Sequence, residues 1–377
     1  MDITRPLALL GGLSPAQFMK RHWQKKPLLV RGALPGFAPL LSRAQLFALA
    51  GQDEVESRLV AHSGGRWRLR RGPFPRRALP PLAQPGWTLL VQGVDLHHQG
   101  AHQLLSRFGF LPQARLDDLM ISHATDGGGV GPHFDSYDVF LLQAHGRRRW
   151  RYGRQRDLSL LPDSPLKILA RFEPEVECVL EPGDLLYLPP RFAHDGVAVG
   201  ECQTCSIGFR SPAGAELARD LLQRLSEDAA DAAGERLYRD PGQPATDAPG
   251  AIPQALQQFA RTALAAALKD PQALQRALGE SLSEPKPNVW FESAPAAGLE
   301  SGVVLDRRTR MLYDRRHVFI NGESHRAAGR DAALLRALAD GRRLGAAQLA
   351  HAGAATRSLL AAWQQAGWLQ PLGAHDT

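Results

Sequence analysis

The 377-residue sequence predicts a chain that begins as a β-sandwich or barrel and continues as α-helices. Between residues 57 and 211, short apolar runs alternate with turns rich in Gly, Pro and Asp, a pattern typical of all-β domains. After Pro212 the apolar residues recur at the period of about 3.6 that marks an α-helix. We therefore expect a mainly β N-terminal part and a mainly helical C-terminal part.

Two short helices are expected before the β region. Ser14 is a favourable N-cap and Pro15 suits the first helical position, so a helix is predicted over residues 14–26, and a second over residues 42–51. The predicted strands are the apolar runs at 67–69, 87–91, 117–122, 138–143, 149–152, 176–180, 184–188 and 205–209. Many short strands at this spacing favour a sandwich or a barrel.

The segments 214–236 and 253–281 have helical periodicity and are separated by a Pro- and Gly-containing loop at 240–250. Neither helix can bury an apolar face alone. They must pack on the barrel or on a second copy of the chain, and we favour a homodimer.

The C-terminal segment is predicted to form a small unit of strands and helices, consistent with a winged helix. The expected strands are 303–305, 311–313, 317–321 and 368–372, and the expected helices are 331–339, 346–351 and 354–366. Helix 354–366 carries a single basic residue, so we do not expect direct nucleic-acid binding. These observations divide the chain into domains at 1–213, 214–282 and 283–377.

Composition excludes several classes of protein. Hydrophobic residues make up 44% and charged residues 22%, as in ordinary globular proteins. No apolar run approaches the ~20 residues of a membrane span, and the N-terminus lacks the layout of a signal peptide. Three cysteines cannot form a disulfide scaffold. We therefore expect a cytoplasmic protein with no membrane contact.

The net charge of +7 is unevenly distributed. Residues 1–213 contain 26 basic and 19 acidic residues, whereas residues 214–377 contain 19 of each. A basic excess of this size permits contact with nucleic acid or a ribonucleoprotein, and it is equally compatible with a solvated surface. Charge alone does not choose between these interpretations.

The strongest local motif is a glycine-rich stretch, residues 127–131, that leads into His133 and Asp135. Residues i and i+2 of a strand point to the same face, so these two side chains can bind one metal ion. His194 follows a strand that ends at a Pro-Pro corner and is the expected third ligand. Two imidazoles and one carboxylate form the facial triad of non-haem Fe(II) oxygenases. The alternative is a chance pair of surface residues and an unrelated turn histidine.

Such an iron usually oxidises 2-oxoglutarate, whose distal carboxylate needs a basic partner inside the barrel. Arg148 shares a strand face with Trp150, while Arg147 and Arg149 point the other way. If Trp150 points inward, Arg148 is the arginine that can clamp the carboxylate. Ser122 is expected to add a hydroxyl to the same carboxylate, and Arg147 and Arg149 are expected in solvent.

Two further residues are candidates for substrate binding. Asp118 shares a strand face with Ser122 and would lie at the rim, where a carboxylate can hold a cationic side chain. Its alternative is a surface charge at the start of a strand. Tyr137 lies an even number of residues from His133 and Asp135, so in a strand it would point to the same face and line the pocket. The alternative is an ordinary core tyrosine.

At these residues the chain resembles a known family, the bacterial ribosomal oxygenases, which are JmjC-type members of the cupin superfamily. The resemblance covers nearly the whole chain. It is carried by residues 21–27, 117–122, 127–135, 137–140, 146–150, 181–190 and 206–210.

The resemblance implies a double-stranded β-helix, a helical dimerisation region and a C-terminal winged helix. It also implies an Fe(II)- and 2-oxoglutarate-dependent dioxygenase that hydroxylates the β-carbon (C3) of an arginine in a large-subunit ribosomal protein of the L-sixteen family. The residues that match the family's iron ligands are His133, Asp135 and His194, and those that match its 2-oxoglutarate contacts are Ser122 and Arg148. The alternatives are a related oxygenase acting on histidine or another residue, a non-catalytic metal-binding cupin, and a nucleic-acid-binding winged-helix protein.

Overall fold

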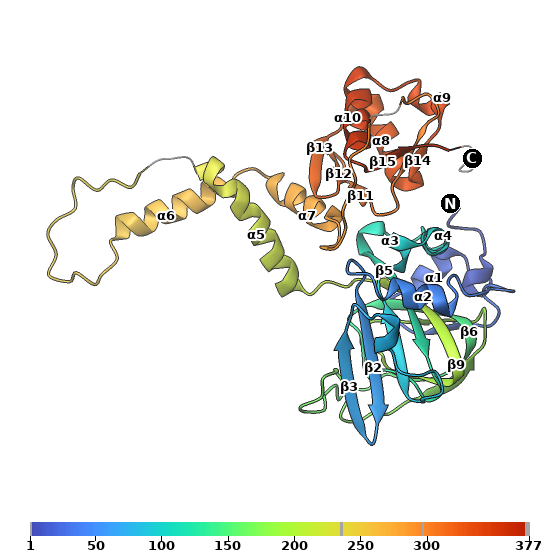
Figure 1. Cartoon of the computed structure of the whole chain (residues 1–377). Helices are drawn as coiled ribbons and strands as arrows, with labels where there is room; N and C mark the ends of the chain where they lie inside the picture. The colour runs from blue at the N-terminus through green and yellow to red at the C-terminus, as the bar shows by residue number, and fades with distance from the viewer. Residues whose placement is uncertain (1, 234–236, 296–297, 374–377) are drawn as a thin grey trace. The chain divides into compact units, whose positions relative to one another are not determined.

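The computed structural model describes residues 2–233, 237–295 and 298–373 and divides into two compact units, Met1–Ser211 and Pro212–Thr377. In Figure 1 the first unit runs from blue to green and is built on a β-sheet, and the second runs from yellow to red and is mainly helical. Within the described residues, no helix is both long and apolar enough to cross a membrane.

The first unit contains one antiparallel sheet of nine strands. Along the sheet the order is β1-β8-β6-β9-β5-β4-β2-β3, and β7 pairs with β6. The strands are β1 (Leu28–Val30), β2 (Ser57–Ser63), β3 (Arg66–Arg71), β4 (Trp87–Val91), β5 (Leu116–Ala124), β6 (Asp138–Gly153), β7 (Val176–Leu180), β8 (Leu185–Leu188) and β9 (Ala193–Phe209). The predicted all-β architecture of this part is confirmed.

The two longest strands, β6 and β9, pair with each other along almost their whole length. The sequence predicts two separate strands at 138–143 and 149–152, but the structure joins them into β6. The register shifts on either side of His145, and Gly146 adopts a φ of +59°. A bulge of this kind bends a strand without ending its pairing, so one strand serves two parts of the sheet.

Short helices pack against the sheet of the first unit. They are α1 (Pro15–Arg21), α2 (Arg43–Leu49), α3 (Val94–His97) and α4 (Gln99–Ser106), with 3₁₀ turns at Ala8–Leu10, Arg76–Ala78 and Gln113–Arg115. Ser14 and Ser42 cap α1 and α2 through reciprocal bonds with the glutamine three residues later. The helix predicted over 14–26 is shorter than expected: α1 ends at Arg21, and the chain then forms a turn in which Gln24 has a φ of +55°.

A buried carboxylate anchors the start of β6. Asp138 is fully buried and accepts hydrogen bonds from the hydroxyl of Tyr187 at 2.6 Å and the side chain of Gln24 at 3.0 Å. It also forms an ion pair with Arg115 at 3.0 Å. These bonds compensate the cost of burying the charge and fix the strand next to Tyr137.

The second unit begins with the helices α5 (Gly214–Ala233), α6 (Gln254–Ala267) and α7 (Ala273–Ser283). The single helix predicted over 253–281 is therefore wrong, because the chain breaks between α6 and α7. Pro271 lies in the break, lacks the amide donor of a continuous helix and disfavours helical geometry at Asp270. Residues 234–236 of the helix predicted over 214–236 lie outside the described residues.

Two small sheets and three helices complete the second unit. The sheets have the orders β14-β10-β15 and β11-β12-β13. The strands are β10 (Val303–Leu305), β11 (Met311–Tyr313), β12 (His317–Ile320), β13 (Glu323–Arg326), β14 (Arg343–Leu344) and β15 (Leu369–Pro371), and the helices are α8 (Gly329–Gly341), α9 (Ala346–Leu349) and α10 (Ala354–Gln365). Their core includes Leu338, Leu360 and Trp363. Helix α7 packs closely on this part, since Gly279 lies against the ring of Phe319.

Candidate metal centre

Three side chains of the first unit gather into one cluster with the donor atoms of a metal site. His133, Asp135 and His194 each offer one ligand atom, and these atoms all lie within 4.8 Å of one another. Oδ2 of Asp135 is 3.5 Å from Nε2 of His194 and 3.9 Å from Nε2 of His133. The structure therefore brings together the three residues that the sequence pattern selects.

Backbone pairing holds these residues together although they are about sixty positions apart in the sequence. His133 and His194 form an isolated antiparallel bridge, with reciprocal N–H to carbonyl bonds of 2.9 and 2.8 Å. The carbonyl of Asp135 accepts a further bond from the amide of Arg191 at 2.8 Å. Arg191 takes a φ of +64°, which turns the chain after the Pro-Pro corner and directs β9 back toward the cluster.

Both histidines are oriented by their other ring nitrogen. Nδ1 of His133 is 2.8 Å from the carbonyl of Gly131, and Nδ1 of His194 is 2.9 Å from the carbonyl of Phe192. A carbonyl only accepts, so each Nδ1 carries the hydrogen and each Nε2 keeps its lone pair for a ligand. Burial, together with the nearby His133, lowers the pKa of His194, which keeps that imidazole neutral as metal binding requires.

A buried guanidinium lies on the strand that pairs with His194. Arg148 is only 4% exposed, and its Nη1 makes a long contact of 3.4 Å with the carbonyl of Gly196. In the described part of the chain its Nε and Nη2 have no hydrogen-bond partner. Burying charged donors without partners costs folding free energy. This geometry is therefore suited to the carboxylate of a bound molecule.

The guanidinium and the histidine cluster are connected through one aromatic ring. Cζ of Arg148 lies 5.8 Å from the ring centroid of Trp150, and that ring lies 6.0 Å from the ring of His194. Arg148 and Trp150 are buried, whereas Arg147 and Arg149 are exposed. The alternation expected from the strand period is therefore present.

Ser122 is buried on β5, and its hydroxyl lies 3.4 Å from the carbonyl of Thr204. Strands β5 and β6 flank β9 on its two sides, so Ser122 and Arg148 come from the strands next to the one that carries His194. A hydroxyl with one long contact can still donate to a bound carboxylate.

The structure changes the expectation for Asp118. Its side chain is only 5% exposed, and Oδ2 accepts a hydrogen bond from the amide of Gly93 at 2.9 Å. The alternative of an exposed surface charge is therefore wrong. A backbone amide 25 residues away fixes this carboxylate, and the strand pattern gave no indication of that partner.

Tyr137 is 37% exposed and lies near three carboxylates and one guanidinium group. Burial raises the pKa of its hydroxyl, and the carboxylates of Asp117, Asp135 and Asp118 raise it further, while Arg210 lowers it. Asp117 and Arg210 form an ion pair at 2.7 Å. One of the three carboxylates near Tyr137 is therefore already paired with a guanidinium group.

The residues that pack against the loop carrying His133 could not be predicted from the sequence. Gly131 takes a φ of +79°, and a Cβ there would lie 2.6 Å from Cδ1 of Ile168 and 2.8 Å from Cζ2 of Trp67. The amide of Leu169 bonds to the carbonyl of Pro132 at 2.8 Å. The glycine itself is the only sequence signal of this close packing.

We expect Gly131→Ala to disturb the cluster strongly. The left-handed backbone and the two close contacts together should reduce the free energy of unfolding by about 2–4 kcal/mol and weaken metal binding by about tenfold. Urea unfolding and calorimetric titration with Mn(II) measure the two effects. Gly127→Ala is the matched control, because Gly127 has a φ of +69° and no neighbour within 4 Å of its Cβ position. Equal losses in the two variants would contradict the packing argument.

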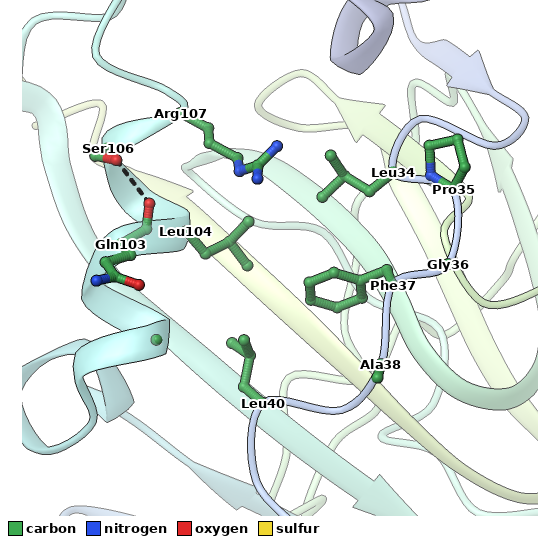
Figure 2. A pocket seen from close by; sticks show the side chains of 11 residues that line it. Leu34, Pro35, Gly36, Phe37, Ala38, Leu40, Gln103, Leu104, Ser106 and Arg107 are labelled. Atoms are coloured by element: carbon green, nitrogen blue, oxygen red, sulfur yellow. Dashed lines mark hydrogen bonds between the residues drawn. The ribbon is translucent and has the colours of Figure 1, made fainter.

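A separate groove of about 680 Å³ lies between the loop at 34–40 and helix α4 (Figure 2). Figure 2 shows Phe37 and Leu40 on the loop, with Leu104 and Arg107 across from them. None of the candidate metal or 2-oxoglutarate residues lines this groove, so it is not part of the metal centre.

Comparison with known proteins gives matches over both units. The JmjC domain family matches residues 103–217, and the ROXA-like winged helix family matches residues 266–370. The ribosomal protein uL16 3-hydroxylase of Escherichia coli K12 is 36% identical over 323 residues, which are 81% of this chain and 84% of that protein.

Two solved structures of E. coli YcfD are similar over almost the whole chain. One has a TM-score of 0.81 and 32% identity and covers 95% of this chain and 98% of that chain. The other, of YcfD as a ribosomal oxygenase in complex with cobalt and 2-oxoglutarate, has a TM-score of 0.78 at 31% identity, with the same coverage. These matches confirm the predicted fold class, a JmjC-type cupin barrel followed by helices and a C-terminal winged helix.

Proposed function

This chain belongs to the ribosomal oxygenases, JmjC-domain proteins with a ROXA-like winged helix, and from this we propose that it is an Fe(II)- and 2-oxoglutarate-dependent hydroxylase of ribosomal protein uL16. The reaction we assign is hydroxylation at C3 of an arginine. The observation that carries the proposal is a His-Asp-His cluster together with a buried guanidinium whose Nε and Nη2 have no hydrogen-bond partner among the described residues.

The residues of the site fit both Fe(II) and 2-oxoglutarate. Nε2 of His133, a carboxylate oxygen of Asp135 and Nε2 of His194 would hold Fe(II), and this donor set leaves positions free for a co-substrate. Arg148 and Ser122 would donate to the distal carboxylate of 2-oxoglutarate. When bound, the iron and 2-oxoglutarate supply the oxidising power that replaces a hydrogen of the substrate by a hydroxyl group.

The chain's own contribution is to position the groups and to exclude water. The carbonyls of Gly131 and Phe192 fix both imidazoles, so the ligand atoms are arranged before metal arrives. The burial of Arg148 strengthens its attraction to a carboxylate, because a buried charge is less screened by water.

Asp118 and Tyr137 remain our proposed substrate contacts. Asp118, Asp135 and the ion pair of Asp117 with Arg210 lie near Tyr137, and this excess of acidic groups supports a subsite for the guanidinium of an arginine substrate. Recognition of a basic ribosomal protein would then depend on these local acids and not on the net charge of +7.

The test is a reaction with full-length uL16, Fe(II) and 2-oxoglutarate, followed by tandem mass spectrometry. We expect a gain of one oxygen atom localised on an arginine. Oxygen on a histidine would support the alternative of a histidine hydroxylase, and no oxygen transfer with no 2-oxoglutarate turnover would leave only a metal-binding cupin. The same assay of Asp118→Ala tests that residue, since unchanged hydroxylation would remove it from the proposed substrate site.

We also propose that α5 and α6 form a homodimer interface. These two helices pack on each other, yet Leu222 on α5 is 62% exposed and Leu264 on α6 is 64% exposed. Further exposed apolar side chains on and beside α6 are Ile252, Leu256 and Leu268. Apolar residues exposed in this number on neighbouring helices support burial against a second copy.

Leu264→Arg is expected to convert the dimer into a monomer. The substitution removes apolar burial worth about 1.5–3 kcal/mol per copy and places a charge in the interface. The fold of the single chain should tolerate it, because Leu264 is exposed there. Sedimentation velocity measures the change. Gln258→Arg adds the same charge at an exposed position on another side of α6 and should remain dimeric. A wild-type chain that sediments as a monomer at micromolar concentration would contradict the proposal.

Two remaining expectations are also proposals. The winged helix is not a nucleic-acid reader, because Arg357, the single basic residue of α10, donates to the carbonyls of Leu349 and Ala352 of its own domain. A cytoplasmic location follows from a ribosomal-protein substrate, and the three cysteines, all free thiols, are compatible with a reducing compartment.

A further inference from the structure

One stretch of the first unit concentrates positive charge. Residues 57–94 contain seven arginines and no lysine, aspartate or glutamate, so their formal charge of +7 equals the net charge of the whole chain. The arginines are Arg58, Arg66, Arg68, Arg70, Arg71, Arg76 and Arg77. Protein surfaces usually intersperse charges of both signs, so an uninterrupted run is unusual.

The structure places most of these arginines along one edge of the sheet. Strand β3 is the last strand in the sheet order and carries four of them, all exposed. Arg76 and Arg77 follow in a 3₁₀ turn and are also exposed. In the described part of the chain, no ion pair joins any of the seven to a carboxylate. We call the exposed six, Arg66, Arg68, Arg70, Arg71, Arg76 and Arg77, the arginine edge.

Protection of an edge strand against pairing with another chain does not account for this charge. A charge or two on the strand is enough for that purpose. Arg76 and Arg77 lie outside any strand, so they need a different explanation.

An aromatic hollow adjoins the arginine edge. It has a volume of about 540 Å³ and is lined by Phe47, Phe74 and Leu82, with Arg43 and Arg76 among its walls. The guanidinium of Arg76 lies 5.2 Å from the ring centroid of Phe47, and that of Arg70 lies 5.4 Å from the ring of Phe74. Both rings are buried, with Phe47 4% and Phe74 1% exposed, so the exposed guanidinium groups that cover them form the accessible flat surface. Guanidinium planes over aromatic rings suit a flat, polar ring.

We propose that the arginine edge and this hollow bind single-stranded RNA, with phosphates along β3 and a base in the hollow. Exposed arginines neutralise successive phosphates, and the guanidinium planes of Arg70 and Arg76, held over the buried rings, provide a surface on which a base can stack. An acidic peptide would match the charge but would have no flat ring for the hollow. RNA is the partner that accounts for both features.

The position of the arginine edge relates it to the metal centre. Trp67 of β3 packs against Gly131, whose carbonyl orients His133. Trp67 alternates with Arg66 and Arg68 along β3, so the strand itself borders the loop that carries a metal ligand, while these two arginines point to the other face. The proposal departs from the expectation of no direct nucleic-acid binding, which rested on helix 354–366, on the neutral charge of the C-terminal part and on a solvated arginine cluster in the first unit. The proposal does not require hydroxylase activity, so either one can fail without the other.

Fluorescence anisotropy with a labelled single-stranded RNA of about 12 nucleotides tests the proposal on the full chain. The variant Arg66→Gln/Arg68→Gln/Arg71→Gln/Arg77→Gln should bind at least tenfold more weakly at moderate salt. The slope of log affinity against log salt should fall by about 3, as expected when four phosphate contacts to a single strand are lost. Circular dichroism confirms that the variant is folded.

The matched control is Arg315→Gln/Arg316→Gln/Arg326→Gln/Arg330→Gln, which removes the same charge from exposed positions of the second unit. It should bind RNA like the wild type. Equal weakening in the two variants would mean attraction by net charge alone and would overturn the proposal. Wild-type affinity in the β3 variant would also overturn it.

The hollow is tested separately at Ala48, an exposed residue in its wall. Ala48→Glu should weaken RNA binding at least fivefold relative to Ala48→Gln, because the two side chains have similar size and only the carboxylate repels a nucleotide. Competition by poly-glutamate as strong as competition by unlabelled RNA would assign the arginine edge to an acidic protein and overturn the RNA proposal.

Discussion

Asp135→Ala is expected to abolish 2-oxoglutarate turnover, with a rate reduced by at least about 1,000-fold, equivalent to more than about 4 kcal/mol in the barrier. Asp135 contributes the only negative charge of the cluster, and its oxygen lies between the two imidazoles. Without it, two neutral nitrogens remain, and the affinity for Mn(II) should fall at least about 100-fold. Its side chain is partly exposed, so the fold should tolerate the change.

Calorimetric titration with Mn(II) and a 2-oxoglutarate consumption assay measure the two effects. His133→Ala should behave like Asp135→Ala in both. Glu177→Ala is the control, since it removes an exposed carboxylate of β7 from the same unit and should leave metal affinity and turnover unchanged. Metal affinity that survives the loss of Asp135 would mean that the metal is bound elsewhere.

Arg148→Met is expected to separate stability from function. The substitution removes a buried charge that has unpaired donors, so the free energy of unfolding of the ligand-free protein should stay the same or increase by about 1–2 kcal/mol. The same change removes the clamp for the distal carboxylate, so binding of 2-oxoglutarate should weaken by about 100- to 1,000-fold, the loss of about two charged hydrogen bonds.

Denaturant unfolding measures the first effect, and titration of 2-oxoglutarate into the Mn(II)-loaded protein measures the second. Arg149→Met is the matched control, because Arg149 is exposed on the opposite face of the same strand and should alter neither quantity. If Arg148→Met bound 2-oxoglutarate normally but unfolded at lower denaturant concentration, Arg148 would be a structural residue.

The parts of the site that follow from local geometry could be predicted from the sequence. The period of two in a strand assigns Arg148 and Trp150 to one face and Arg149 to the other, and the structure has this alternation. The same rule predicted that His133 and Asp135 share a side; the structure brings them together, although His133 forms only an isolated bridge and Asp135 lies outside any strand. Capping residues also predicted where α1 and α2 begin, because Ser14 and Ser42 bond to the helix backbone a few residues away.

The parts that depend on distant partners could not be predicted in this way. The buried carboxylate of Asp118 is held by the amide of Gly93. The imidazole of His133 is oriented by the carbonyl of Gly131. The bridge between His133 and His194 joins segments that only the folded sheet brings together. The break at Pro271 was present in the sequence, but apolar periodicity on both sides of it favoured one continuous helix.

The central claim, that this chain is a dioxygenase of a ribosomal protein, is tested most directly by the origin of the oxygen that it transfers. The reaction is run with uL16, Fe(II), 2-oxoglutarate and isotopically labelled dioxygen in ordinary water, and intact-protein and small-molecule mass spectrometry follow the label. We predict one labelled oxygen atom in uL16 and one in succinate, in equal amounts, and none with Asp135→Ala. Unlabelled product, or consumption of 2-oxoglutarate with no oxygen in uL16, would contradict this account.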